Sequence, residues 1–140
     1  MRYLAIDLGQ KRTGLAIGDD FMRIASPLDV LETSNPEHRL RLLEAAIAQQ
    51  EPDALVLGLP LNMDGTESPA SKDVRALGEL LQQRTNKPVH FVDERLSSYA
   101  ADQQMAGSNL TRGGKKARRD ALAAANVLRD FLAGLPKRGT

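Results

Sequence analysis

The chain has 140 residues, of which 41% are apolar and 26% are charged, and it contains no cysteine. We expect a single domain with one core, because compact domains usually have about 100–200 residues. The longest apolar run, at residues 54–61, is too short for a membrane-spanning helix, and Asp7 interrupts the N-terminus before the apolar core of a signal peptide could form. The sequence therefore predicts a cytoplasmic protein that does not bind membranes.

Basic residues are concentrated near the C-terminus. Residues 1–110 contain 11 basic and 16 acidic side chains, a net charge of −5, whereas residues 111–140 contain 8 basic and 2 acidic ones, a net charge of +6. This pattern is typical of a protein that meets a polyanion at one place, although a solvated charged surface gives the same pattern. With no cysteine and only two histidines, His38 and His90, a catalytic metal would have to be bound by carboxylates.

The first part of the chain predicts three strands. Short apolar runs at residues 2–7 and 13–18 lie on either side of a basic turn after Gly9, and this arrangement favours a hairpin. Residues 24–31 form the third candidate strand. Pro27 places that strand at a sheet edge, where a missing backbone N–H removes no hydrogen bond from the sheet.

The rest of the chain alternates helices with strands. A helix is expected from Pro36, after the capping residue Asn35, until residue 51, and the continuous apolar run at residues 54–59 predicts a parallel strand that is covered on both faces. A loop at 62–71 follows, then an amphipathic helix through Val74, Leu77 and Leu81 and a strand at 88–92. The last predicted elements are a short helix at 97–105, a basic loop or loose helical turn at 111–119 and a helix at 120–132.

This order of elements predicts an α/β fold with three layers, in which a mixed sheet of five strands has helices on both faces. We expect one domain over residues 1–133 and a frayed C-terminal tail over residues 134–140.

Two acids stand at the predicted carboxyl ends of strands, where open α/β sheets bind ligands. Asp7 ends the first strand, although an aspartate near a glycine is also ordinary turn chemistry. Asp93 and Glu94 end the fifth strand, and because side chains alternate along a strand we expect only Glu94 to join a site. The alternative for this acidic pair is a surface ion pair with Arg95, which could instead bind phosphate beside a metal.

A third acid, Asp120, opens the predicted last helix, where an aspartate is a preferred N-cap. It follows a run of basic residues that would suit phosphates, which favours a second interpretation as a metal ligand. Magnesium is usually held by a few carboxylates together with substrate phosphate oxygens. Two such ions can activate water and stabilise a leaving oxygen without histidine or cysteine.

Four segments spread over residues 5–128 carry a family resemblance: AIDLGQKRTGLAIGD, VLGLPLNMDGTES, VDERLSS and RRDALAAANVL. They resemble the bacterial YqgF family, also called RuvX, whose members are described as Holliday-junction-resolvase-like proteins and as pre-16S rRNA nucleases. The resemblance implies an RNase H-like fold with strand order 3-2-1-4-5. It also implies that Asp7, Glu94 and Asp120 bind metal and are catalytic, and that the cofactor is Mg²⁺ or Mn²⁺.

The chain departs from the pattern of that family in a few places. Ser97 and Ser98 stand where threonines are common, and Gln10 replaces a residue that is often threonine. Many RNase H-like nucleases also take an acid from the end of the fourth strand, which here has none, so Asp64 in the following loop is a further candidate ligand.

Basic residues near these acids are candidates for binding a nucleic-acid backbone. Lys11 and Arg12 lie one turn from Asp7, although exposed turn residues can equally be solvated. The other candidates are Arg95, Arg112, Lys115, Lys116, Arg118 and Arg119. Such contacts position a substrate without reading its sequence. Because the chain has only five aromatic residues for base stacking, specificity is expected to come from shape or from partners.

The leading hypothesis is a metal-dependent nuclease that processes the 5′ end of precursor 16S rRNA, with structured RNA and ribosomal precursor particles as partners. The first alternative is a Holliday junction resolvase that acts on branched DNA. Junction cleavage usually needs two symmetric sites, so a homodimer would favour the resolvase and a monomer the RNA nuclease. A non-catalytic nucleic-acid-binding module is the alternative from another class. An actin-like phosphotransferase is disfavoured because its two domains would need roughly 300 residues.

Overall fold

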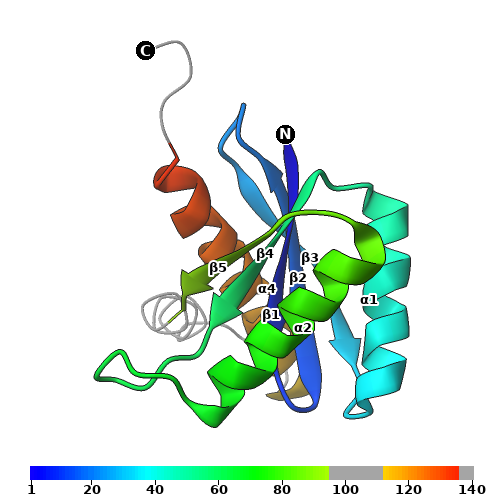
Figure 1. Cartoon of the computed structure of the whole chain (residues 1–140), viewed down its shortest axis with the longest axis vertical. Coiled ribbons are helices and arrows are strands. Elements are labelled where there is room, and N and C mark those ends of the chain that lie inside the picture. Colours follow the sequence, from blue (N-terminus) through cyan, green and yellow to red (C-terminus); the bar gives the residue numbers. More distant parts are fainter. Residues whose placement is uncertain (95–111, 136–140) are drawn as a thin grey trace.

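The computed structural model describes residues 1–94 and 112–135, and the side chains of residues 112–119 lie outside that description (Figure 1). Five strands form one sheet in the order β3-β2-β1-β4-β5, which confirms the predicted strand order. The elements are β1 (Arg2–Leu8), β2 (Arg12–Asp19), β3 (Ala25–Glu32), α1 (Pro36–Gln50), β4 (Ala54–Leu59), α2 (Pro69–Thr85), β5 (Val89–Asp93) and α4 (Arg112–Ala133).

The sheet is mixed. β1 pairs with β2 and β2 with β3 in antiparallel fashion, whereas β1 pairs with β4 and β4 with β5 in parallel. All six residues of β4 are buried, which confirms the predicted parallel strand that is covered on both faces. β3 is an edge strand that contains Pro27, and the β2–β3 register shifts between Leu15 and Ala16. A proline and a bulge make this edge a poor template for pairing with another chain.

Helices cover both faces of the sheet, as predicted, with α1 and α2 on one face and α4 on the other (Figure 1). Strand alternation produces two separate cores. In β1, Leu4 and Ile6 pack with the apolar side chains of α1 and α2, whereas Tyr3 and Ala5 pack with α4. The core residues of α4 include the small Ala124 and Ala125, which allow the helix to lie close to the sheet.

Local sequence signals explain where the first two helices begin. The Asn35 side chain accepts a hydrogen bond from the backbone N–H of His38 at 3.0 Å, and Pro36 occupies the first turn of α1. In α2, the N-cap Ser68 and Ser71 exchange hydrogen bonds in a capping box, so this helix begins at Pro69, inside the segment predicted as a loop.

The start of α4 corrects two predictions. The helix begins at Arg112, so of the two alternatives for this basic segment the loop is wrong and the helical one is closer, and Asp120 lies inside the helix instead of opening it. Gly113 and Gly114 each cost about 1 kcal/mol in a helix, but lysine, arginine and alanine are good helix formers, and the packed later turns provide the nucleus from which the helix extends. The N-cap explanation for Asp120 is therefore wrong.

Several predictions remain untested. The short helix expected at residues 97–105 lies outside the described residues, as does most of the tail expected at residues 134–140. Gly134 and Leu135 are described, and both donate backbone hydrogen bonds to the last turn of α4. Among the described residues, no helix is long and apolar enough to cross a membrane.

Candidate active site

Asp7 and Glu94 project from the sheet on the face that α4 covers. In β1, Tyr3 and Ala5 pack against α4, so the alternation of side chains directs Asp7 to the same face. In β5, the His90 ring lies 4.9 Å from the ring of Phe131 in α4, and the same alternation directs Glu94 to that face. The structure thus brings two of the predicted acids together, at the carboxyl ends of β1 and β5.

Gly58 in β4 makes room for this pair. A Cβ atom at residue 58 would lie 2.5 Å from Oε2 of Glu94, so the Glu94 carboxyl group occupies the space that a side chain of β4 would otherwise fill. The end of β4 contributes no acid, as the sequence indicates, and contributes space instead. Sequence reasoning missed this role of Gly58, although a glycine within a strand is a known sign of close approach.

The two carboxyl groups are in an environment that disfavours their charge. Burial, the hydrogen bond with Asp7 and the charges of Asp7 and Asp93 together raise the pKa of Glu94 to about 10. Burial and the charge of Asp120 raise the pKa of Asp7, while its interaction with Glu94 lowers it. Glu94 is only 8% exposed, and its Oε2 atom has no hydrogen-bond partner among the described residues. Strongly raised pKa values at a strand end are typical of functional sites.

Asp120 approaches the pair from α4. Gly14 lies opposite Asp7 in the β1–β2 register, and a Cβ atom at residue 14 would be 2.0 Å from the backbone oxygen of Asp120. Only a glycine at this position therefore lets α4 pack so closely, and the contact keeps Asp120 near enough for its charge to raise the pKa of Asp7. Gly14 is a second positioning residue that sequence reasoning missed.

Asp120 is also bound to a predicted phosphate-binding residue. Arg12 donates from Nε to Oδ2 of Asp120 at 3.1 Å, and both side chains are less than a third exposed. Among the described residues, no group of three or more histidine, cysteine or acidic side chains is arranged to hold a metal ion. Asp7 and Glu94 alone nevertheless fit a magnesium or manganese ion, because such ions often take one or two protein carboxylates and complete their shell with water and substrate phosphate.

The structure describes only some of the other predicted site residues. Lys11 is exposed in the β1–β2 turn. Arg95 lies outside the described residues, and so do the side chains of the basic residues of α4, namely Arg112, Lys115, Lys116, Arg118 and Arg119. Asp64 accepts hydrogen bonds from the backbone N–H and the hydroxyl of Thr66, so it helps to hold the loop that follows β4.

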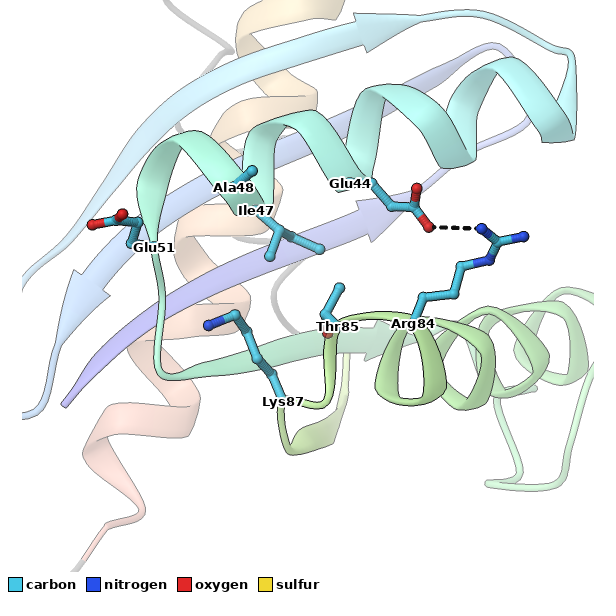
Figure 2. A pocket seen from close by; sticks show the side chains of 7 residues that line it. All are labelled: Glu44, Ile47, Ala48, Glu51, Arg84, Thr85 and Lys87. Carbon is cyan, nitrogen blue, oxygen red and sulfur yellow. Dashed lines mark ion pairs between the residues drawn. The ribbon is translucent and has the colours of Figure 1, made fainter.

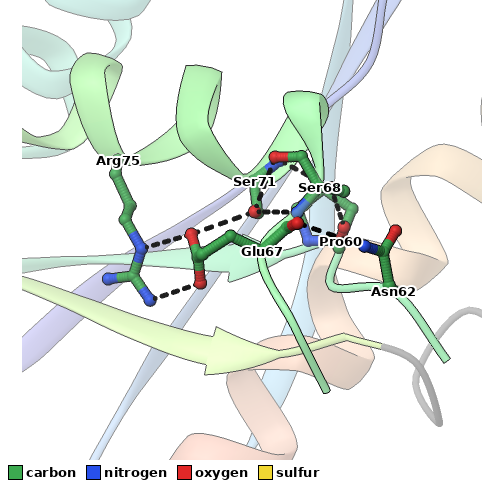
Figure 3. A network of polar contacts seen from close by, with 6 residues as sticks. All are labelled: Pro60, Asn62, Glu67, Ser68, Ser71 and Arg75. Carbon is green, nitrogen blue, oxygen red and sulfur yellow. Dashed lines mark hydrogen bonds and ion pairs between the residues drawn. The ribbon is translucent and has the colours of Figure 1, made fainter. Parts of the chain in front are cut away.

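A polar network joins this loop to the start of α2 (Figure 3). Glu67 accepts two hydrogen bonds from Arg75 at 2.8 and 3.1 Å, and it accepts a third from the hydroxyl of Ser71. The hydroxyl of Ser68 donates to the backbone oxygen of Pro60 at 2.5 Å, which ties the first turn of α2 to the end of β4. The motif GLPLNMDGTES is therefore a structured connection beside the site.

A separate cavity of about 710 Å³ lies between the last turns of α1 and α2 (Figure 2). It is lined by charges of both signs, including the ion pair between Glu44 and Arg84 at 3.3 Å. Because β4 only begins at this end of the helices, the cavity is remote from the strand ends that carry Asp7 and Glu94, and we do not connect it with that site.

The chain is similar in sequence to a family model and to relatives whose names describe nucleases. A family model described as "RuvX: Holliday junction resolvase" matches residues 1–134. A relative from Anaeromyxobacter sp. (strain Fw109-5), named "Putative pre-16S rRNA nuclease", is 40% identical over 134 residues, which cover 96% of this chain and 98% of the relative. A relative with the same name from Burkholderia thailandensis is 44% identical over 133 residues, which cover 95% and 88% of the two chains.

Solved structures show the same fold at low identity. The Fowlpox virus resolvase in complex with Holliday junction DNA matches with a TM-score of 0.62 and 15% identity, over 98% of this chain and 100% of that one. Thermus thermophilus RuvC with a Holliday junction substrate matches with a TM-score of 0.58 and 15% identity, over 96% and 97%. The sheet order and these neighbours confirm the RNase H-like fold.

Proposed function

Because this chain belongs to the RuvX family, we propose that it is a metal-dependent nuclease that hydrolyses phosphodiester bonds in precursor 16S rRNA. The observation that carries the proposal is the carboxyl pair at the carboxyl ends of β1 and β5, in which Glu94 is buried, Asp7 is partly buried and both pKa values are raised chiefly by burial. The names of the relatives supply the substrate, and the resolvase fold supplies the class of reaction.

Asp7 and Glu94 would hold the metal ion, Mg²⁺ or Mn²⁺. Such an ion makes water a better nucleophile and stabilises the charge that develops on the leaving oxygen. The protein supplies a site that is ready for a cation, because two carboxyl groups buried side by side cannot both carry a charge unless a positive charge compensates them. A divalent cation held by Asp7 and Glu94 would supply that positive charge and would favour the ionised form of both groups.

Asp120 and Arg12 would act around this pair. While Arg12 binds Asp120, that acid is neutralised and Arg12 is held close to the strand end where substrate would lie. A substrate phosphate is a strong competitor for the guanidinium group of Arg12. We propose that exchange of this partner lets Asp120 act as the third acid, and that the basic residues of α4 and Lys11 bind the nucleic-acid backbone.

The test is a cleavage assay with Mn²⁺ on a precursor 16S rRNA fragment and on a four-way DNA junction. We expect the RNA to be cleaved and Asp7→Asn to abolish cleavage while the circular dichroism spectrum stays unchanged. Glu79→Gln, which changes an exposed acid of α2, is the matched control and should keep full activity. Undiminished cleavage by Asp7→Asn would overturn the proposed site.

Junction resolution is the second candidate, because two solved structures of this fold hold Holliday junction DNA. It predicts cleavage of the junction in preference to the RNA and a stable dimer in solution. Sedimentation of the protein with and without the junction separates the two candidates, since the RNA nuclease is expected to sediment as a monomer.

A further inference from the structure

A cavity of about 480 Å³ lies on the other face of the sheet, beside the strand end that carries Asp7. It is bounded by Leu8 and the β1–β2 turn, by the end of β4, by α1 and by the first turn of α2. Its size is within the range of small-molecule sites, about 300–1,000 Å³. Because Leu8 follows Asp7 directly in β1, a nucleotide next to the one at Asp7 could reach this cavity.

Arg39 of α1 contributes the most unusual group in the cavity wall. Its Nε atom is buried, and it has no hydrogen-bond partner within residues 1–94 and 112–135. A buried N–H without a partner is costly, so a native structure that keeps one needs an ordered water or a bound group to satisfy it. Asp73 of α2 lines the same cavity and forms no ion pair with Arg39 within those residues.

The charges of the wall argue against a simple ion as the ligand. A phosphate attracted by Arg39 would be repelled by Asp73, and a metal ion attracted by Asp73 would be repelled by Arg39. The first turn of α2 offers little to an anion, because the backbone N–H groups of Ser68 and Ser71 are used in the capping box, at 2.8 and 3.0 Å, and Pro69 has none (Figure 3).

We propose that this cavity binds an unpaired nucleobase of the RNA, with guanine preferred, an inference that rests on the proposed function. Leu8, Pro60 and Pro69 offer apolar surface to the faces of the base. The guanidinium group of Arg39 donates to O6 and N7 of guanine, and the carboxylate of Asp73 accepts from its N1–H and amino groups. Adenine, cytosine and uracil each lack part of this pattern.

The proposal explains how a chain with few aromatic residues can choose a cleavage position. Protein contacts to the backbone carry no sequence information, and sequence-specific RNA recognition usually targets unpaired bases. A base held on one face of the sheet would fix which phosphate reaches Asp7 and Glu94 at the edge. Arg39 and Asp73 are then specificity-determining residues.

Binding of free nucleosides to the whole chain tests the site without any need for cleavage. Guanosine, adenosine, cytidine, uridine and inorganic phosphate are titrated separately while the backbone amide signals of Gly9, Gln10 and Ala70 are followed by NMR. We expect guanosine to shift these signals with an affinity at least about fivefold higher than that of the other nucleosides. Phosphate alone should leave them unchanged.

Two variants and two matched controls complete the test. Asp73→Asn, at an exposed position that tolerates change, should remove the preference for guanosine, and Arg39→Gln should remove binding. Arg41→Gln, on an exposed part of α1, and Glu79→Gln, on α2, should bind guanosine like the unchanged chain. The NMR spectrum itself reports whether each variant is folded.

The possible failures are distinguishable. A chain that cleaves RNA with Mn²⁺ but binds all four nucleosides equally, or none of them, overturns the base site and leaves the proposed function intact. Signals that respond to phosphate alone identify a backbone subsite and also overturn it. A chain that binds guanosine but never cleaves nucleic acid overturns the proposed function instead.

Discussion

At the scale of single residues, the carboxyl pair of Asp7 and Glu94 makes the stability of the metal-free protein depend on pH. In the folded protein the pKa of both groups is raised above the ordinary value for an acid, chiefly by burial. The folded state therefore binds protons more tightly than the unfolded state. The contribution of this pair to stability is fully present below the unfolded pKa, about 4, and is lost as the pH rises toward the folded pKa values.

We therefore predict that the metal-free protein becomes less stable between pH 5 and pH 8. The free energy of unfolding, measured by urea denaturation in the presence of EDTA, should fall by more than about 1 kcal/mol over this range. Glu94→Gln cannot lose a proton at this position and should show a much smaller decrease. Mn²⁺ should reverse the loss in the unchanged chain but not in Glu94→Gln. A loss of equal size in both proteins would contradict this account.

The pair of Arg12 and Asp120 leads to a second prediction. Arg12→Gln removes the cation that neutralises Asp120, so we expect Mn²⁺ to bind several-fold more tightly to the protein without nucleic acid. A partly exposed ion pair is worth up to about 1 kcal/mol, which sets the size of the effect. Isothermal titration calorimetry measures it, with Arg41→Gln as the control for loss of one positive charge elsewhere. An unchanged affinity would mean that Asp120 takes no part in metal binding.

At the scale of elements, the site depends on how closely α4 packs against β2. The sequence predicts the later part of α4 correctly, because Ala121, Ala124 and Ala125 mark a helix that can approach a sheet. It does not predict the start of the helix, because Gly113 and Gly114 are locally unfavourable for a helix. Contacts distant in sequence, such as that between Gly14 and Asp120, decide the outcome.

Gly14→Ala tests this packing. A methyl group at residue 14 would lie 2.0 Å from the backbone oxygen of Asp120, so α4 would have to move. We expect a loss of about 2 kcal/mol or more in the free energy of unfolding, since backbone atoms yield less readily than side chains, together with a large loss of cleavage. Gly134→Ala is the matched control, because the nearest atoms there are 3.6 Å away and stability should change little. A stable, active Gly14→Ala protein would contradict the proposed role of Gly14.

At the scale of the whole molecule, periodicity predicts the layers and most element boundaries, but not which strands become neighbours. The order β3-β2-β1-β4-β5 is implied only by the family resemblance, whereas the grouping of Asp7, Glu94 and Asp120 also follows from the chemistry that a carboxylate-bound metal requires. Asp7 and Glu94 are recognisable as acids at strand ends. Their mutual burial was not predictable, because it depends on Gly58 of a third strand and on the cover provided by α4.

The uneven charge of the chain is the last feature at this scale, and it predicts how binding responds to salt. Residues 112–119 carry five basic groups directly before Asp120, within a helix that reaches the site. If these groups contact phosphates, each contact releases counterions and contributes about 0.7–0.9 to the slope of log affinity against log salt concentration.

Lys115→Gln combined with Lys116→Gln should therefore lower the slope by about 1.4–1.8, as measured by fluorescence anisotropy with a labelled RNA and Asp7→Asn protein. Lys72→Gln combined with Lys87→Gln removes the same charge from another part of the surface and should leave the slope unchanged. Equal slopes for the two double variants would show that the affinity for RNA depends only on the net charge of the protein. The basic residues at the start of α4 would then not be part of the binding surface.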